Sequence, residues 1–507
     1  MGENYKNLES KLLEESYNIA NASSKSVEEG LYLVGDNGFY QLRLLLIFFV
    51  QWMVSVFIFV GPVYYFPDPE FQCSDGESCT EDNGGCKEQK LASSSYTTIT
   101  SDFKLYCEDR DLRSIAQSAL FWGPIFGNIF FSFIADWKGR RPSLIAAWSL
   151  CTLGILGITF SYNIYQLILM IFITGFSLVP CNNLNLIIVN EQSGEAFRQR
   201  GTTILLMSWA IFEIFLVPIA KYVYNWRNIF IYFTLIPSCV IAVLNYLFIY
   251  ESPRFLLTKE LRNEMYLTLN KIAKVNNREV LTRHDCFIKP IESNQTQKIF
   301  TYLDLVKYKS LRLITIASCV VMFFTQMIYY STQYSLGTVG SNLYINTLVV
   351  GTGESIAYFF CNQVAHRLQR KLFTFIFYTS SILLCLLFLF VKSDITQTLL
   401  ACLVRIFNCG TLCISALFVE ELYPTTVRSL GVGAQMSIGV AGSSLAPIVI
   451  DQAKKLSINP LLATGILSIP AIYTISLFKE TKGEPLQDDI FEFQQEIKNS
   501  KTSQKYV

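Results

Sequence analysis

The sequence contains only two histidines in 507 residues, and its 14 cysteines include no pair at the Cys-x-x-Cys spacing. It has no Walker-type glycine loop and no grouping of a nucleophile with a base. Charged residues are scarce at 16%, against roughly 25% in an ordinary soluble protein, and no basic arm is present. These absences argue against an enzyme, an ATP-driven pump and a nucleic-acid-binding protein. We therefore expect no catalytic residues, no metal ligands and no cofactor.

Apolar residues dominate instead. Hydrophobic residues make up 51% of the chain and aromatic residues 14%. They gather in runs of about 18 to 25 residues, long enough as helices to cross a hydrocarbon core of about 30 Å. The charged residues lie between these runs. This pattern predicts an all-α protein that crosses the lipid bilayer many times.

The apolar runs predict two groups of six membrane-spanning helices. One group lies in residues 44–250 and the other in residues 311–478, and the polar stretch 251–310 separates them. Residues 1–43 and 479–507 are predicted to lie outside the membrane. The predicted spans are 44–65, 114–135, 142–160, 166–190, 202–223, 228–249, 311–331, 341–365, 372–391, 395–419, 430–450 and 460–478.

The short loops between spans predict the orientation. Lys and Arg gather in the turns 138–141, 198–200 and 367–371, which all fall on one side. The opposite turns 161–165 and 332–340 carry neither residue. Because basic loops stay in the cytoplasm, both chain ends and the central polar stretch are predicted to be cytoplasmic. The protein is expected in the plasma membrane.

The loop after the first span, residues 66–113, is predicted to face the exterior. It holds Cys73, Cys79, Cys86 and Cys107. An oxidising exterior permits disulfides, and four cysteines allow three pairings, all of which remain open.

The central polar stretch contains one helical pattern. Leu261, Met265, Leu269 and Ile272 recur at spacings of three to four residues among charged residues. This spacing predicts an amphipathic helix that lies against the inner face of the bundles.

Four motifs carry a family resemblance. Residues 136–141 (Asp-Trp-Lys-Gly-Arg-Arg) resemble the turn between spans two and three of the major facilitator superfamily. Residues 251–256 (Glu-Ser-Pro-Arg-Phe-Leu), 421–428 (Glu-Leu-Tyr-Pro-Thr-Thr-Val-Arg) and 479–486 (Lys-Glu-Thr-Lys-Gly-Glu-Pro-Leu) resemble motifs of solute carrier family 22 within that superfamily. The resemblance covers nearly the whole chain.

The resemblance implies two six-helix bundles related by pseudo-symmetry, with a central cavity that opens alternately to either side. It also implies a secondary transporter of small organic ions, with a small-molecule organic ion as its partner. One alternative is a carrier for organic anions or for neutral solutes such as sugars. An alternative of another class is a membrane sensor that does not transport.

Charged motif residues on the cytoplasmic side predict a conformational latch, which holds the two halves together in one state and breaks in the other. The alternative is that Arg140 and Arg141 only fix the topology. The corresponding turn of the second half, residues 365–371, lacks the Asp and the Gly, so its latch is predicted to be degenerate. The latch candidates are Asp136, Arg140, Arg141, Glu191, Glu251, Arg254, Glu421 and Arg428.

Three charged residues fall about 15 to 20 Å into predicted spans, near the middle of the bilayer. They are Glu213, Glu354 and Arg405. Placing a charged side chain at the centre of the bilayer costs about 3 kcal/mol on insertion scales, so each of these residues needs a structural or functional reason. If Arg405 forms a structural pair with one glutamate, the other carboxylate is left to face a cationic substrate or to carry a proton.

The resemblance adds to these assignments. Glu354 matches an acidic position of the family's cation carriers, whereas Arg405 matches an arginine found in cation and anion carriers alike. Val440 stands where cation carriers have Asp and anion carriers have Arg, so this position does not predict the charge of the substrate. The two glutamates favour a cation or zwitterion. Tyr329 and Tyr330 resemble the aromatic pair that lines the family's cavity. The predicted substrate-binding residues are Glu354, Glu213, Tyr329, Tyr330 and Arg405.

Overall fold

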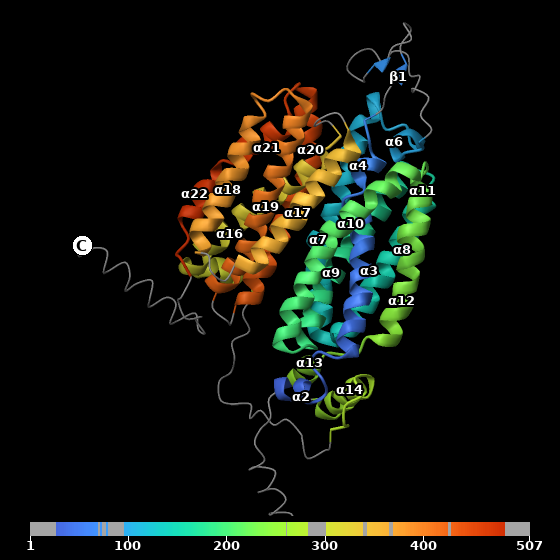
Figure 1. The fold of residues 1–507 in the computed structure, drawn as a ribbon, viewed down its shortest axis with the longest axis vertical. Coiled ribbons are helices and arrows are strands. Elements are labelled where there is room, and N and C mark those ends of the chain that lie inside the picture. Colours follow the sequence, from blue (N-terminus) through green and yellow to red (C-terminus); the bar gives the residue numbers. More distant parts are fainter. Residues whose placement is uncertain are drawn as a thin grey trace, which may run out of the picture.

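The computed structural model describes residues 27–68, 71–72, 78–79, 96–259, 261–281, 301–337, 342–364, 369–423 and 427–481. Within these residues the chain is almost wholly helical (Figure 1). The short strands β1 (Phe71–Gln72) and β2 (Ser78–Cys79) pair antiparallel.

The first half forms the blue-to-green bundle in Figure 1, here called the N-terminal bundle. Its helices, with the 3-10 turn η2 and the π-helical turn η3, are α2 (Val27–Leu33), α3 (Phe39–Phe59), α4 (Pro62–Tyr65), α6 (Ile99–Asp102), η2 (Cys107–Asp109), α7 (Arg110–Lys138), α8 (Arg140–Thr159), α9 (Ile164–Glu191), α10 (Glu195–Tyr222), α11 (Trp226–Ile229), η3 (Phe230–Leu235) and α12 (Ile236–Phe248).

The second half forms the yellow-to-red bundle, here called the C-terminal bundle, and three helices of the described chain lie between the halves in sequence. These elements are α13 (Pro253–Thr258), α14 (Arg262–Val275), α15 (Tyr302–Lys307), α16 (Lys309–Tyr334), α17 (Leu343–Val364), α18 (Arg370–Leu387), α19 (Asp394–Leu422), α20 (Arg428–Lys455), α21 (Pro460–Ser468) and α22 (Pro470–Ser476). We call the end of the molecule that carries α6 the α6 end, and the opposite end the α14 end (Figure 1).

Ten helices of the described chain are long and apolar enough to cross a membrane. Helix α17 has the length, at 22 residues, but contains Glu354 and several other polar residues. The twelfth predicted span is divided into α21 and α22, with Pro470 at the start of α22, because proline cannot continue the hydrogen-bond ladder of a preceding helix. With these two passes the predicted fold, two bundles of six helices, is confirmed.

Several helices extend beyond the apolar runs that predicted them. Helix α3 begins at Phe39 rather than Leu44, α7 begins at Arg110 rather than Ser114, and α20 continues to Lys455. The additional turns of α7 and α20 are mostly charged or polar, whereas that of α3 includes the buried Tyr40 and Gln41. Hydropathy detects the embedded part of a helix and not its full length.

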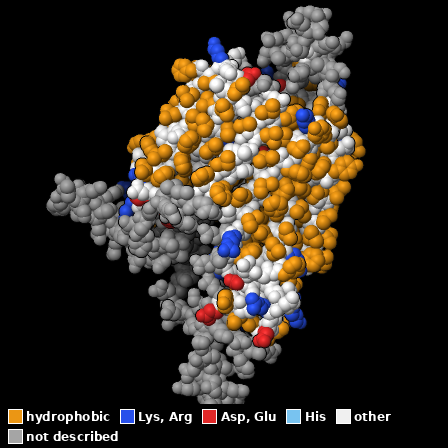
Figure 2. Space-filling view, viewed as in Figure 1, with side chains coloured by type: hydrophobic (Ala, Val, Ile, Leu, Met, Phe, Trp, Pro, Cys, Tyr) orange, Lys and Arg blue, Asp and Glu red, His pale blue; other side chains and the backbone are white. Residues whose placement is uncertain are grey.

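The outer surface is apolar over its broad middle. Figure 2 shows hydrophobic side chains covering the face of both bundles, with charged side chains near the two ends. Large exposed side chains include Phe126, Phe133, Val243 and Leu247. A continuous apolar surface of this extent fits contact with lipid chains.

The two bundles pack through α7 against α20 and through α10 against α17. Between them, the Tyr334 hydroxyl on α16 donates to the Phe59 carbonyl on α3 at 2.8 Å. Tyr64 of α4 stacks on Tyr344 of α17, with ring centroids 5.8 Å apart. The N-terminal and C-terminal bundles therefore share a packed interface.

The predicted amphipathic helix is confirmed as α14. Met265, Leu269 and Ile272 are buried, whereas Leu261 precedes the helix and is 43% exposed. The Asn276 side chain at the end of α14 accepts from the Tyr40 backbone N–H at 2.8 Å, so α14 is attached to the N-terminal bundle.

Candidate functional site

Three charged side chains from three helices meet between the bundles. Arg405 of α19 places its Nε 2.9 Å from Oε2 of Glu354 on α17. Its Nη2 lies 3.5 Å from Oε1 of Glu213, which belongs to α10 of the other bundle. All three side chains have no exposed surface. We call these three residues the charged cluster.

Helix α16 completes the surroundings of the charged cluster. Arg405 donates from Nη1 to the Tyr329 carbonyl at 2.7 Å and from Nη2 to the Gln333 side-chain oxygen, and its guanidinium lies 3.6 Å from the centre of the Tyr329 ring. The Tyr329 hydroxyl donates to Glu354 Oε1 at 2.7 Å and accepts from Trp209 Nε1 at 2.9 Å. Sequence reasoning missed Gln333 and Trp209, because uncharged polar residues are common in apolar runs.

The two glutamates are held differently. Glu354 forms an ion pair with Arg405 Nε and accepts a hydrogen bond from the Tyr329 hydroxyl. Glu213 has the longer contact to Arg405, and it lies near Gln333 and Glu354 without a well-aligned hydrogen bond. The sequence predicted one ion pair and one separate carboxylate. In the structure Arg405 lies between both glutamates and is closer to Glu354.

Aromatic rings from both bundles pack together. Tyr330 of α16 is nearly buried, and its ring lies 4.5 Å from that of Phe121 on α7. Phe59 on α3 lies 5.5 Å from Phe121 and 6.2 Å from Trp209, which in turn lies 6.2 Å from Trp52. Since Trp209 also donates to Tyr329, this aromatic group is continuous with the charged cluster.

A second set of charges lies at the α14 end of the N-terminal bundle. Arg140 Nε lies 3.3 Å from Glu191 Oε2. The backbone N–H groups of Arg140 and Arg141, at the start of α8, donate to Glu251 at 2.9 and 3.3 Å. Burial raises the pKa of the Glu251 carboxyl, against the lowering effect of these N–H donors and that of Ser252. A carboxylate thus caps the positive end of α8.

The C-terminal bundle repeats this arrangement. Arg370 Nη2 lies 3.1 Å from Glu421 Oε1, and the two residues are separated by 51 positions, as are Arg140 and Glu191. The backbone N–H groups of Arg370 and Lys371, at the start of α18, donate to Glu480 at 2.8 and 3.1 Å. The prediction that the second cluster is degenerate is therefore wrong.

Gly139 explains why the two turns differ in sequence. It is the single residue between α7 and α8, its φ is +118°, and a Cβ there would lie 2.2 Å from Glu251 Oε2. Glycine is the residue that tolerates this conformation. Gln369, which precedes α18, has a φ of −72°, so this position does not require glycine.

The predicted latch residues form contacts within one half of the molecule. Arg140 with Glu191 and Glu251, like Arg370 with Glu421 and Glu480, joins helices of one bundle. A latch that links the two halves stays a prediction. The remaining latch candidates lie nearby: Arg141 donates to the Tyr246 carbonyl, Asp136 lies 3.1 Å from Arg140, Arg254 is in α13, and Arg428 begins α20 with its side chain outside the described part.

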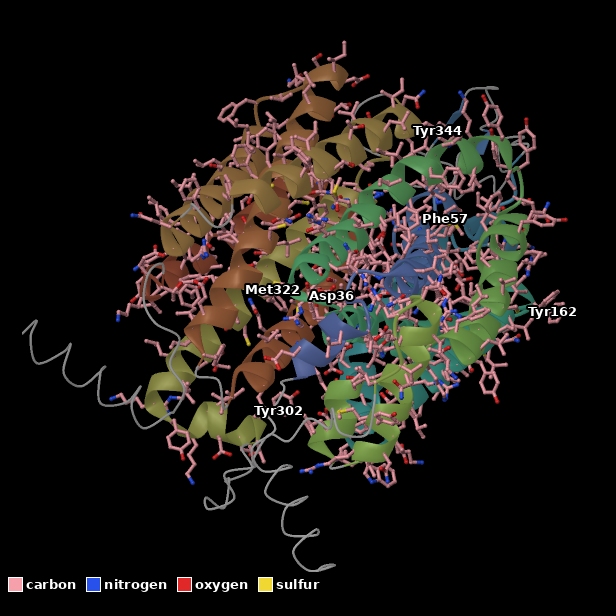
Figure 3. All side chains as sticks on the ribbon, turned by 60° about the horizontal axis from the view of Figure 1, so that its bottom comes forward. Asp36, Phe57, Tyr162, Tyr302, Met322 and Tyr344 are labelled. Atoms are coloured by element: carbon pink, nitrogen blue, oxygen red, sulfur yellow. The ribbon has the colours of Figure 1, made fainter. Side chains whose placement is uncertain are left out.

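The charge of Asp136 acts on a residue that precedes the second bundle. Burial, and then the nearby Asp136 carboxylate, raise the pKa of Tyr302 on α15. Figure 3, in which the α14 end comes forward, shows Tyr302 at the near edge of the molecule and Tyr344 at the far edge.

The two capping carboxylates should contribute similarly to stability. We expect Glu251→Ala and Glu480→Ala each to destabilise the protein by about 1–2 kcal/mol, since each leaves the first N–H groups of a long helix without an acceptor. Thermal unfolding of the purified protein measures this. Glu264→Ala, at an exposed position of α14, is the control and should unfold like the wild type. Unchanged unfolding of both capping variants would contradict the assignment.

At the α6 end, opposite charges link the bundles. Arg110 Nε at the start of α7 lies 2.9 Å from Asp451 Oδ1 near the end of α20, and both side chains are largely buried. Lys455 Nζ lies 2.5 Å from Asp111 Oδ1 and 3.0 Å from Asp451 Oδ2. Sequence reasoning missed these pairs, because their charges lie outside the apolar runs and resemble ordinary loop residues.

Asp68, just after α4, adds a further link at this end. It lies 3.1 Å from Arg113 Nη2 on α7 and 2.6 Å from Lys454 Nζ on α20. Burial opposes ionisation of Asp68, but Lys454 and Arg113 outweigh it, so the pKa of this carboxyl is lowered from its ordinary 3.8. Its stabilising contribution is present at neutral pH and is lost as the pH falls through the lowered pKa.

Removing one charge should loosen the α6 end. We expect Asp451→Asn to increase amide hydrogen exchange roughly tenfold at the adjoining ends of α7 and α20, a change of about 1.4 kcal/mol, because Arg110 loses its charged partner while largely buried. Asp394→Asn removes a charge at an exposed position of α19 and serves as the control. Equal exchange in wild type and Asp451→Asn would show that these pairs do not hold the ends together.

Of the four predicted disulfide cysteines, Cys107 is disulfide-bonded. Cys79 lies in β2, and Cys73 and Cys86 lie outside the described residues. Within the described part of the chain, no group of three or more His, Cys, Asp or Glu residues is placed to hold a metal ion.

The molecule consists of two helical bundles that have matching capped helices and share the charged cluster. With its apolar outer surface, this is the architecture of a membrane transporter built from two related halves. The family model "Major Facilitator Superfamily" matches residues 90–447. The chain belongs to the major facilitator superfamily. It is therefore a multi-pass membrane transporter and not an enzyme.

Relatives confirm the resemblance to solute carrier family 22. The chain is 25% identical over 408 residues to human solute carrier family 22 member 13, covering 78% of this chain and 71% of that protein. It is 24% identical over 480 residues to organic cation/carnitine transporter 4 of Arabidopsis thaliana, covering 90% and 89%. It is 25% identical over 412 residues to the organic cation transporter protein of Drosophila melanogaster, covering 78% and 73%.

Solved structures support the fold. A partially occluded inward open conformation of the xylose transporter XylE from E. coli superposes with a TM-score of 0.62 at 16% identity, covering 88% of this chain and 100% of that one. At this identity the likeness concerns the fold alone.

Proposed function

We propose that the protein moves small organic cations or zwitterions across the membrane by alternating access. The charged cluster carries this proposal. It offers two carboxylates to one guanidinium, and it lies where α10 of one bundle meets α17 and α19 of the other. A cationic substrate would provide the missing positive charge at the place where the two bundles separate.

The aromatic group supports the same substrate class. Tyr329 lies over Arg405 and packs on Tyr330, and Tyr330 packs on Phe59 and Phe121 of the other bundle. Aromatic faces attract organic cations and supply apolar contact. The names of two relatives, an organic cation transporter and an organic cation/carnitine transporter, agree with a cation or zwitterion.

We further propose that the α14 end is cytoplasmic, that both chain ends lie on that side and that the protein resides in the plasma membrane. The ion pairs of Arg110, Asp451 and Asp68 at the α6 end support a state that is closed toward the exterior. Transport would require these pairs to separate when the cavity opens outward.

Uptake into vesicles tests the substrate class. The panel consists of labelled tetraethylammonium, carnitine, an aromatic sulfonate and a hexose, each added to proteoliposomes that contain the full chain. We expect uptake of tetraethylammonium or carnitine above that of empty liposomes. Uptake confined to the sulfonate or the hexose would overturn the proposal, and uptake of no compound would favour a sensor.

A further inference from the structure

The charged cluster has an excess of one negative charge when both glutamates are ionised. All three side chains have no exposed surface. A buried carboxylate without full compensation costs several kcal/mol. The other ionisable groups near Glu213 in the described chain are Glu354 on α17, Arg405 and Cys409 on α19, Tyr329 and Tyr330 on α16, and Tyr64 on α4.

Only Arg405 among these neighbours carries a positive charge, because tyrosine and cysteine side chains are neutral or negative. Its guanidinium is already engaged, since Nε pairs with Glu354, Nη1 donates to the Tyr329 carbonyl and Nη2 donates to Gln333. The closed cluster reaches neutrality most easily when one carboxyl binds a proton.

Glu213 is the better proton carrier of the two glutamates. Glu354 accepts from the Tyr329 hydroxyl at 2.7 Å and lies 2.9 Å from Arg405, contacts that favour the ionised form. Glu213 lies near Gln333 and Glu354 but accepts no well-aligned hydrogen bond, and its distance to Arg405 is 3.5 Å. A proton on Glu213 therefore removes the excess charge and disturbs the fewest interactions.

Glu213 also lies on the moving boundary. It belongs to α10, whereas Arg405 and Glu354 belong to the C-terminal bundle. Gly351 of α17 packs beside it, and a Cβ on that glycine would lie 3.5 Å from Glu213 Cγ. If the bundles separate during transport, Glu213 would leave Arg405 and meet water, with which its proton would exchange.

We propose that Glu213 holds a proton in the closed, substrate-free state and releases it when an organic cation binds, so that one proton is exchanged for one cation. The proton leaves the carboxyl for water on the side to which the cavity is open, and the cation takes its place beside the carboxylate. The cluster is then neutral both with the proton and with the cation. This inference rests on the proposed transport of organic cations and adds the coupling ion.

The test uses proteoliposomes of the full chain with labelled tetraethylammonium, a permanent cation that cannot itself carry a proton. With the membrane potential clamped to zero and the lumen one pH unit more acid, we expect about tenfold accumulation, because one pH unit is a tenfold proton ratio. An imposed potential alone should cause no accumulation, since the exchange moves no net charge. Accumulation that follows the potential and ignores the pH gradient would overturn proton exchange and leave cation transport intact. Absence of uptake would overturn both.

A binding measurement isolates Glu213 from transport. Adding tetraethylammonium to purified protein in weak buffer should release about one proton per bound cation from wild type, and none from Glu213→Gln. Glu264→Gln, at an exposed position, is the matched control and should release as wild type does. Glu213→Asp keeps a carboxyl and should retain the release if Glu213→Gln fails to fold. Cation binding without proton release in wild type would contradict the proposal.

Discussion

Replacing Arg405 with glutamine should prevent most of the protein from folding stably. The substitution leaves the Glu354 carboxylate buried with no positive partner, next to the Glu213 carboxyl, and breaking such a pair costs about 3–5 kcal/mol. It also removes the donors to the Tyr329 carbonyl and to Gln333. We expect a large loss of monodisperse protein in size-exclusion chromatography and a lower unfolding temperature.

Two further variants at this site separate charge from geometry. Arg405→Lys keeps the charge but cannot reproduce the three-way donor geometry, so we expect an intermediate loss. Adding Glu354→Gln to Arg405→Gln should recover part of the stability, because the unpaired Glu354 carboxylate is then replaced by a neutral amide. A wild-type unfolding temperature for Arg405→Gln would show that the charged cluster does not stabilise the fold.

Replacing Glu354 with glutamine should abolish cation uptake while the protein remains folded. Glutamine is close in size and can still accept from the Tyr329 hydroxyl, but the cluster loses the charge that attracts a cation. Loss of one charge contact at a buried site corresponds to about 1–3 kcal/mol, or roughly tenfold to hundredfold in affinity. Initial uptake rates at varied cation concentration measure this effect.

Asp394→Asn, which removes one negative charge at an exposed position of the same bundle, is the control for Glu354→Gln. It should transport as the wild type does. Normal uptake by Glu354→Gln, with equal amounts of protein in the vesicles, would remove Glu354 from the binding site.

The residues of the charged cluster could be predicted from the sequence, but not their arrangement. Glu213, Glu354 and Arg405 are conspicuous because an ionisable residue inside an apolar run is expensive. That one arginine lies between both glutamates depends on the register of α10, α17 and α19 against one another. A single sequence contains no information on that register. Trp209 and Gln333 complete the cluster and show no such signal.

The charges at the two ends of the molecule were harder to predict. The cluster of Arg370, Glu421 and Glu480 could not be predicted from the first turn, because residues 365–371 lack its Asp and Gly. Gly139 is needed only for the local positive φ of the first turn. The pair Arg110–Asp451 lies beyond the apolar runs. Charges in such positions become informative only when the helices that carry them are known to meet.

The fold itself was predicted more fully. The apolar runs predicted all the long helices, including α17, whose polar residues place it below the hydropathy of the other spans. The break between α21 and α22 was not predicted, although Pro470 was visible in the predicted span. A proline inside a membrane helix can kink it or divide it, depending on its neighbours.

Equilibrium binding of labelled tetraethylammonium to the purified protein tests most directly whether the charged cluster binds organic cations. We predict saturable binding to the wild type and to Asp394→Asn, competition by other organic cations but not by an aromatic sulfonate, and at least tenfold weaker binding to Glu354→Gln, about 1.4 kcal/mol. Equal affinity of wild type and Glu354→Gln, or displacement by the sulfonate and not by cations, would contradict a cation site at this cluster.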